Sequence, residues 1–292
     1  MISYALSTSS VSPYITETVA EAIRNSKFRN YEFCFKIAAW EEEALAHSNM
    51  ARQLVKEGAM NVVSVHMPFH NGTEWDASYP NETIRRRVVN NHIRLLRESA
   101  DFIGRHVTLH ASGEPPMEEH PERMDKICKT LEELMPTLEE FNYTINIEYL
   151  PRTCVGNCVE EIRQIINNFD ASRVGVCMDV NHIMDRYREL PDIIRALAPR
   201  INTFHISDYD GVDETHWMPG QGVYNWGEIL DCINKIDHDV VLIFETTAQL
   251  KRTDREIDPA FRLRQNEKAC FFMENFRRLT AEIDNFIIPG NN

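Results

Sequence analysis

The sequence lacks the features that mark membrane-spanning, secreted or nucleic-acid-binding chains. No apolar run approaches the roughly 18–20 residues of a membrane span. The first residues, MISYALSTSS, have neither the basic start nor the apolar core of a signal peptide. Lysine and arginine total 31 against 45 aspartates and glutamates, a formal net charge of −14, and a field of this sign repels nucleic acid and anionic membranes. We therefore expect a cytoplasmic protein with no nucleic-acid or membrane partner.

Linkers and paired cysteines are also missing from the sequence. No stretch rich in Gly, Ser or Pro and no low-complexity segment divides the 292 residues. The seven cysteines are odd in number, and no second pair joins Cys154 and Cys158 to complete a zinc site. This composition predicts free thiols and one domain over residues 1–292, with a short terminal extension after about residue 284.

Eight short apolar runs alternate with charged segments in which the apolar residues have helical spacing. Three of the helical segments cover residues 82–103, 122–141 and 159–169. This alternation favours an α/β fold with a parallel sheet. Eight such units in 292 residues fit a single (β/α)8 TIM barrel, and an open doubly wound sheet is the alternative. The runs are residues 2–6, 31–35, 62–66, 106–110, 144–148, 174–179, 201–205 and 240–245.

Polar side chains recur at the carboxyl ends of these runs. Because side chains alternate along a strand, Glu148 shares a face with Asn146 and Thr144. Asp179 likewise shares a face with Cys177. In a barrel this small or polar face points inward, and its last residue lies at the carboxyl-terminal mouth, where such barrels hold their chemistry. The residues that we expect at the mouth are His66, His110, Glu148, Asp179, His205 and Glu245.

Three carboxylates at one mouth repel one another unless a cation lies between them. Two glutamates, one aspartate and one histidine suit Mn²⁺, Mg²⁺, Co²⁺ or Zn²⁺. The sequence therefore predicts one divalent metal ion, and its predicted ligands are Glu148, Asp179, His205 and Glu245. A satisfied polar network without a metal is the alternative.

Seven short motifs surround these residues: SVHMPF (64–69), TLHAS (108–112), NIEYLPR (146–152), MDVNH (178–182), FHISD (204–208), HWMPGQG (216–222) and IFETT (243–247). Together they resemble the xylose isomerase-like TIM barrel superfamily. This group includes the sugar phosphate isomerases and epimerases, the ketose 3-epimerases, the inosose dehydratases and the AP endonuclease family 2 enzymes such as endonuclease IV. The resemblance covers nearly the whole chain, and it implies the same four metal ligands.

The resemblance also implies catalytic and substrate-binding roles. In the ketose epimerases the glutamates that match Glu148 and Glu245 move the proton: one takes it from the carbon beside the carbonyl, and the other returns one on the opposite face of the enediolate. His182 matches a histidine that contacts substrate hydroxyls, and Arg152 resembles the arginine of an E-x-x-x-R stretch. Two further residues are of interest: Trp217 is a candidate wall of the sugar site, and Asp208 is expected to orient His205 or a substrate hydroxyl.

The chain departs from the epimerases at one position. They often carry an arginine six residues after the histidine that matches His205, and Gly211 stands there, within the acidic segment SDYDGVDET. This departure weakens the case for a ketose 3-epimerase in particular and for a phosphorylated substrate.

Endonuclease IV offers a second comparison, because that family binds three zinc ions. Its additional ligands match His66, His110, His182 and His216, and Glu214 stands where that family has an aspartate. These four histidines therefore either bind a second metal or additional zinc, or contact the substrate. The acidic composition argues against DNA binding.

We therefore predict a metal-dependent isomerase or epimerase that acts on a small sugar, sugar phosphate or polyol. An inosose-type dehydratase would share its first step, and an endonuclease IV-like zinc phosphodiesterase would share its ligands. A barrel that binds a sugar without catalysis is a further alternative. Barrels of this kind often pair through their helices, so the sequence is compatible with either a monomer or a homo-oligomer.

Overall fold

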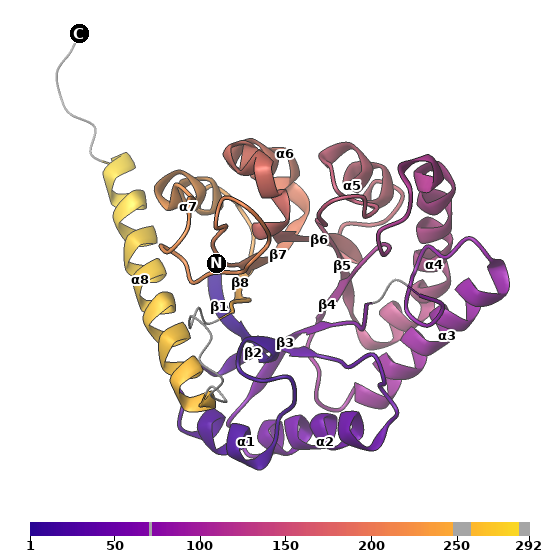
Figure 1. Cartoon of the computed structure of the whole chain (residues 1–292), viewed down its shortest axis with the longest axis horizontal. Coiled ribbons are helices and arrows are strands. Elements are labelled where there is room, and N and C mark those ends of the chain that lie inside the picture. Colours follow the sequence, from indigo (N-terminus) through magenta and orange to yellow (C-terminus); the bar gives the residue numbers. More distant parts are fainter. Residues whose placement is uncertain (70–71, 248–257, 286–292) are drawn as a thin grey trace, which may run out of the picture.

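The computed structural model describes residues 1–69, 72–247 and 258–285, and in this part of the chain eight parallel strands close into a barrel in the order β1 to β8. Figure 1 looks down the barrel and shows the helices in a ring outside the strands. The predicted (β/α)8 TIM barrel is therefore confirmed. The strands are β1 (Ile2–Ser7), β2 (Asn30–Cys34), β3 (Asn61–His66), β4 (His106–Leu109), β5 (Thr144–Glu148), β6 (Val174–Asp179), β7 (Ile201–Ile206) and β8 (Val240–Phe244).

The helices lie between the strands where the helical spacing predicts them. Asn81 begins α3 because its side chain accepts hydrogen bonds from the backbone N–H groups of Thr83 and Ile84. Asn142 ends α4 in the left-handed conformation, with φ of 56°. The α-helices are α1 (Glu17–Arg24), α2 (Glu42–Lys56), α3 (Glu82–Ser99), α4 (His120–Phe141), α5 (Val159–Ile166), α6 (Leu190–Leu197), α7 (Trp226–Asn234) and α8 (Pro259–Asn285). Short 3₁₀ helices are η1 (Thr8–Ser10), η2 (Met117–Glu119), η3 (Asn181–Glu189) and η4 (Ala198–Arg200).

The two faces of the barrel strands differ in chemistry, as the alternation predicts. Val107 and Ile145 belong to the apolar core that packs under the helices, whereas Ser64 and Thr108 are fully buried polar side chains on the opposite face. Glycine suits position 175 on this face, because a Cβ there would lie 2.1 Å from the Asn202 side-chain amide nitrogen and 2.9 Å from the Arg200 carbonyl oxygen. The interior is thus packed with small and polar groups, which leaves the chemistry to its carboxyl-terminal end.

Three further predictions concern the chain as a whole. No helix among the described residues has both the length and the apolar character needed to cross a membrane. The seven cysteines are free thiols. The extension expected after about residue 284 lies beyond Asn285 outside the described residues and stays a prediction.

Candidate functional site

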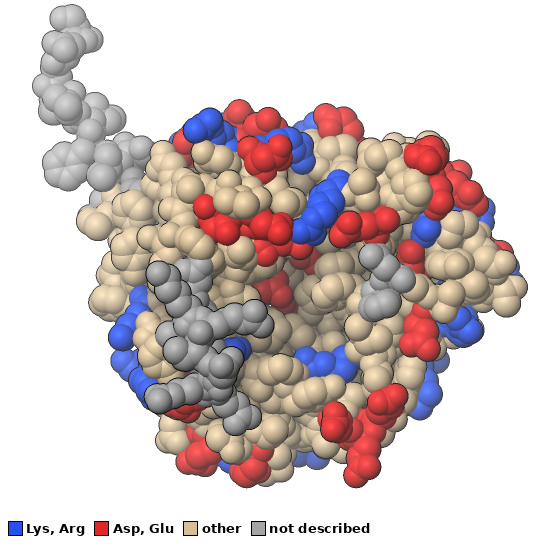
Figure 2. Space-filling model, in the orientation of Figure 1, with Lys and Arg blue, Asp and Glu red and all other residues tan. Residues whose placement is uncertain are grey.

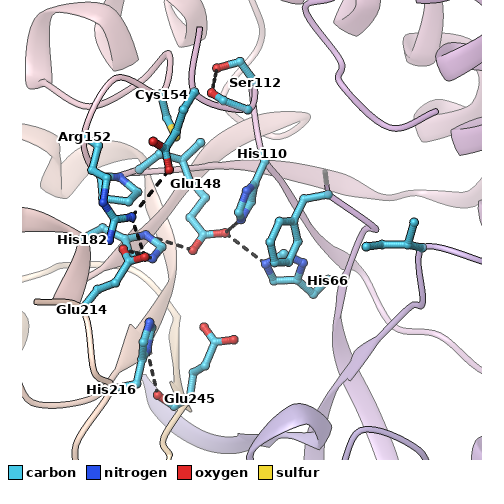
Figure 3. A pocket seen from close by; sticks show the side chains of 16 residues that line it. His66, His110, Ser112, Glu148, Arg152, Cys154, His182, Glu214, His216 and Glu245 are labelled. Atoms are coloured by element: carbon cyan, nitrogen blue, oxygen red, sulfur yellow. Dashed lines mark hydrogen bonds and ion pairs between the residues drawn. The ribbon is translucent and has the colours of Figure 1, made fainter. Parts of the chain in front are cut away.

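A cavity of about 400 Å³ opens at the carboxyl-terminal mouth of the barrel. Figure 2 shows the hollow at the centre of this face, with acidic side chains inside it and along its rim. The close-up in Figure 3 shows histidine and carboxylate side chains that converge on the cavity from several strand ends and loops. The side chains that line the cavity include His66, His110, Glu148, Arg152, His182, Glu214, His216 and Glu245.

The four predicted metal ligands form one group at this mouth. One ligand atom from each of Glu148, Asp179, His205 and Glu245 lies within 4.8 Å of the others. His205 Nδ1 is 3.1 Å from Glu148 Oε1 and 2.9 Å from Glu245 Oε2. His205 and Asp179 are fully buried, and Glu148 is 1% exposed. The structure therefore brings together in space the residues that the strand ends predict.

Asp179 has one carboxylate oxygen that is held by the backbone and one that is not. Its Oδ1 accepts hydrogen bonds from the backbone N–H of Asn181 at 2.7 Å and of His182 at 3.3 Å. Its Oδ2 is buried and finds no hydrogen-bond partner among the described residues. A buried carboxylate oxygen without a partner is costly, and three carboxylates with one imidazole are a donor set that divalent cations accept. The residues present therefore fit a divalent metal ion.

A second group lies beside the first and shares Glu148 with it. His66 donates its Nδ1–H to the carbonyl oxygen of Met67 at 2.8 Å, which directs its Nε2 at Glu148 Oε2, 3.1 Å away. His110 Nε2 lies 2.9 Å from the same oxygen. Glu148 thus presents Oε1 to the central group and Oε2 to this histidine pair. These three residues form a second set with metal-ligand spacing.

A third group shares Asp179 with the central one. His182 donates its Nδ1–H to the carbonyl oxygen of Tyr149 at 2.9 Å, and its Nε2 is 3.6 Å from Asp179 Oδ2. His216 Nδ1 is 3.2 Å from the carbonyl oxygen of Glu245. Asp179, His182 and His216 also have metal-ligand spacing. A ring held at Nδ1 by a backbone carbonyl, with Nε2 turned to a carboxylate, is the usual setting of a metal-binding histidine.

The glutamates of the site stay ionised. Burial raises the pKa of Glu148, but His110 and His205 more than offset this and hold that pKa well below its usual value. Burial also raises the pKa of Glu245, and His205 again lowers it further than burial raises it. Burial lowers the pKa of His66, but the Glu148 carboxylate raises it to about 10. Burial lowers the pKa of His110, whereas nearby carboxylates raise the pKa of His66 and of His205 despite their burial. Protons on these two histidines thus balance the carboxylates, and a bound cation would release such protons.

Arg152, the predicted substrate-binding residue, lines the cavity but is already paired. Its Nη1 is 2.6 Å from Glu214 Oε1, and its Nη2 is 2.9 Å from Asp213 Oδ1. Both carboxylates come from the acidic segment that follows β7. The guanidinium charge is therefore balanced within the protein, so an anionic substrate would have to displace these carboxylates.

Asp208 and Trp217 lie at the base of the same segment. The fully buried Asp208 accepts hydrogen bonds from Gly220 N at 2.7 Å, Tyr224 N at 3.2 Å and Trp226 Nε1 at 2.8 Å. Trp217 pairs with Asp208 through two backbone hydrogen bonds of 2.7 and 3.0 Å. These contacts make Asp208 an anchor of the loop that carries His216, and its predicted role in orienting His205 or a substrate hydroxyl stays a prediction.

One buried carboxylate near the site is missing from the predicted residues. Glu32 on β2 is fully buried inside the barrel, and its Oε1 is 3.0 Å from His205 Nε2. The signal was a charged residue in the middle of an apolar strand, two positions before the inward-facing Cys34. A rule that takes only the last inward residue of each strand does not include Glu32, because Cys34 follows it on the same face.

The comparison with protein families matches most of the chain. A family model described as "Xylose isomerase-like TIM barrel" matches residues 20–265. Among solved structures, that of a D-tagatose 3-epimerase-like protein superimposes with a TM-score of 0.77 at 19% identity, covering 96% of this chain and 98% of that one. At this identity the structural likeness supports the fold.

The curated relatives are more distant and match less of the chain. An uncharacterised protein of Methanocaldococcus jannaschii is 23% identical over 189 residues, which are 63% of this chain and 64% of that one. A D-psicose 3-epimerase of Enterocloster bolteae is 24% identical over 122 residues, 41% of this chain and 39% of the relative. The match thus spans less than two thirds of the length of either relative.

Proposed function

Because the chain belongs to the xylose isomerase-like TIM barrel family, we propose that it is a divalent-metal-dependent isomerase or epimerase of a small sugar or polyol. The observation that carries the proposal is the central group: four ligand atoms within 4.8 Å of one another, one of them a buried carboxylate oxygen without a hydrogen-bond partner among the described residues. The metal is Mn²⁺, Co²⁺, Mg²⁺ or Zn²⁺, and the donor set admits each of them.

The two glutamates would divide the proton transfer between them. Glu148 and Glu245 face each other across the cavity in Figure 3, so a sugar between them would meet one carboxylate on each face. One glutamate takes the proton from the carbon next to the carbonyl, and the other returns a proton from the opposite side. A divalent metal, when bound, would supply Lewis-acid polarisation of the substrate carbonyl.

The test is isotope exchange on a panel of ketoses and inososes in deuterated water, with purified protein of known metal content. Glu148→Gln and Glu245→Gln should each lower turnover by about 10²–10⁴-fold, while elemental analysis shows that the metal is retained. Glu140→Gln removes an exposed carboxylate on α4 that pairs with Arg97 and should keep wild-type turnover. Unchanged turnover in both active-site variants would contradict the proposal. Loss of water, seen by mass spectrometry, would identify the inosose-type dehydratase instead.

A zinc phosphodiesterase is the second candidate function, and the outer histidines favour it. The groups His66–His110–Glu148 and Asp179–His182–His216 flank the central group and share a carboxylate with it, an arrangement that suits a multinuclear centre. Two or three zinc ions per chain, with hydrolysis of an abasic-site duplex or a simple phosphodiester, would support this candidate. One metal per chain without such hydrolysis would exclude it. The net charge of −14 disfavours a DNA substrate.

A further inference from the structure

Glu32 is a charged side chain in a place where charge is costly. It is fully buried and lies on β2, below the cavity mouth. Ser64 on β3 donates a hydrogen bond to its Oε2 at 2.8 Å, and Thr108 on β4 donates one to the same oxygen at 3.2 Å. Its Oε1 faces His205 on β7, 3.0 Å from Nε2. Side chains from three other strands thus surround this carboxylate. They offset the cost of burying its charge, which would be high without such partners.

The contact between Glu32 and His205 is an electrostatic one. The two atoms are within ion-pair distance, but the approach is bent away from hydrogen-bond geometry. A lone pair on His205 Nε2 would face the carboxylate oxygen at this distance, and the two would repel. A proton on Nε2 turns the same contact into an attraction. The carboxylate therefore favours the ring form with the proton on Nε2.

The other ring nitrogen of His205 points at the metal group. Nδ1 is 3.1 Å from Glu148 Oε1 and 2.9 Å from Glu245 Oε2. A neutral imidazole carries one N–H, and a metal ligand must offer a lone pair. His205 can therefore bind a metal through Nδ1 only when its proton is on Nε2, inside the barrel.

We propose that Glu32 is a positioning residue that holds His205 with its proton on Nε2 and thereby directs the Nδ1 lone pair at the metal group. Glu32 does not itself touch the cavity; it acts through His205, and the Ser64 and Thr108 hydroxyls fix its own orientation. Carboxylate partners of metal-binding histidines commonly account for about 10–100-fold in metal affinity. This inference rests on the proposed metal centre.

The first experiment measures Mn²⁺ affinity by calorimetry on chelator-treated protein. Glu32→Gln should bind Mn²⁺ about 10–100-fold more weakly than wild type, with a melting temperature in chelator close to that of wild type. Ser64→Ala is the matched control, because it removes a donor to Glu32 Oε2 but leaves Oε1 against His205; its loss should be much smaller. Equal affinity in Glu32→Gln and wild type would overturn the inference. No Mn²⁺ binding by wild type would instead overturn the proposed metal centre, and the inference with it.

The second experiment reads the ring form of His205 directly and needs no Glu32 variant. In ¹⁵N-labelled wild type with Zn²⁺ bound, nitrogen NMR should show the proton of the His205 ring on Nε2, because the cation then faces Nδ1 in place of a proton. The signals are assigned by their loss in His205→Asn. A proton on Nδ1 would overturn the inference even if Glu32→Gln failed to fold.

Discussion

His92 on α3 is a buried histidine that the protein holds in the neutral form. Its ring stacks on Trp75 with centroids 5.5 Å apart, and neither ring nitrogen finds a hydrogen-bond partner among the described residues. Burial lowers its pKa from 6.5 to about 4. As pH falls, the unfolded chain takes up this proton before the folded protein does. The free energy of unfolding therefore decreases as pH falls from 6.5 towards 4. The slope due to His92 is about 1.4 kcal/mol per pH unit.

His92→Phe should remove this pH dependence and keep the stacking on Trp75. We expect its free energy of unfolding at about pH 7 to stay within about 1 kcal/mol of wild type, because no hydrogen bond is lost. At about pH 5 the variant should have lost about 2 kcal/mol less than wild type. Urea denaturation at the two pH values measures both quantities. An identical pH slope in the two proteins would contradict the prediction.

Two glycines in the loop between β7 and α7 should respond differently to alanine. A Cβ at Gly222 would lie 2.1 Å from the Tyr209 carbonyl oxygen and 2.4 Å from Asp208 Oδ1, so the backbone must move. Gly220 has φ of 89°, but the space beside it is open, with Phe272 3.9 Å from the added atom. We expect Gly220→Ala to cost about 1–2 kcal/mol through backbone strain. Gly222→Ala should cost more, because it also displaces the buried Asp208 anchor.

Denaturation in urea ranks the two glycine variants, and limited proteolysis locates the change. Gly222→Ala should be cut faster than Gly220→Ala within residues 209–225, because Asp208 holds that loop through three hydrogen bonds. The reverse order of stability would show that backbone conformation, rather than close packing on Asp208, sets the requirement for glycine there.

The strands and six residues at the mouth could be predicted because each depends on a local pattern. The period of two places Glu148 and Asp179 at the ends of inward faces without knowledge of their neighbours. Glu32 could not be matched to His205 in the same way, because that contact spans the closed barrel from β2 to β7. The pairing of Arg152 with Glu214 depends on how the loop after β7 folds over the mouth, which no repeat in the sequence encodes.

A bound cation would tie together strand ends from half of the barrel, so its effect belongs to the whole molecule. The central group joins the ends of β5, β6 and β7 to Glu245, which follows β8. A ligand that binds only the folded state at 100 times its Kd stabilises that state by about 2.7 kcal/mol, which corresponds to a rise in Tm of about 4 °C for a chain of 292 residues. Adding Mn²⁺ or Zn²⁺ to chelator-treated protein should produce a rise of this order.

The net charge of −14 makes a control for general cation binding essential to this prediction. Asp179→Asn removes the carboxylate whose Oδ2 has no hydrogen-bond partner in the described chain, and it should abolish most of the metal-induced rise in Tm. Asp192→Asn removes an exposed carboxylate on α6 and should leave the rise unchanged. The same rise in wild type and Asp179→Asn would mean that the cations stabilise the protein by screening its acidic surface. In that case the strand-end carboxylates would have to be read as a polar network without a metal.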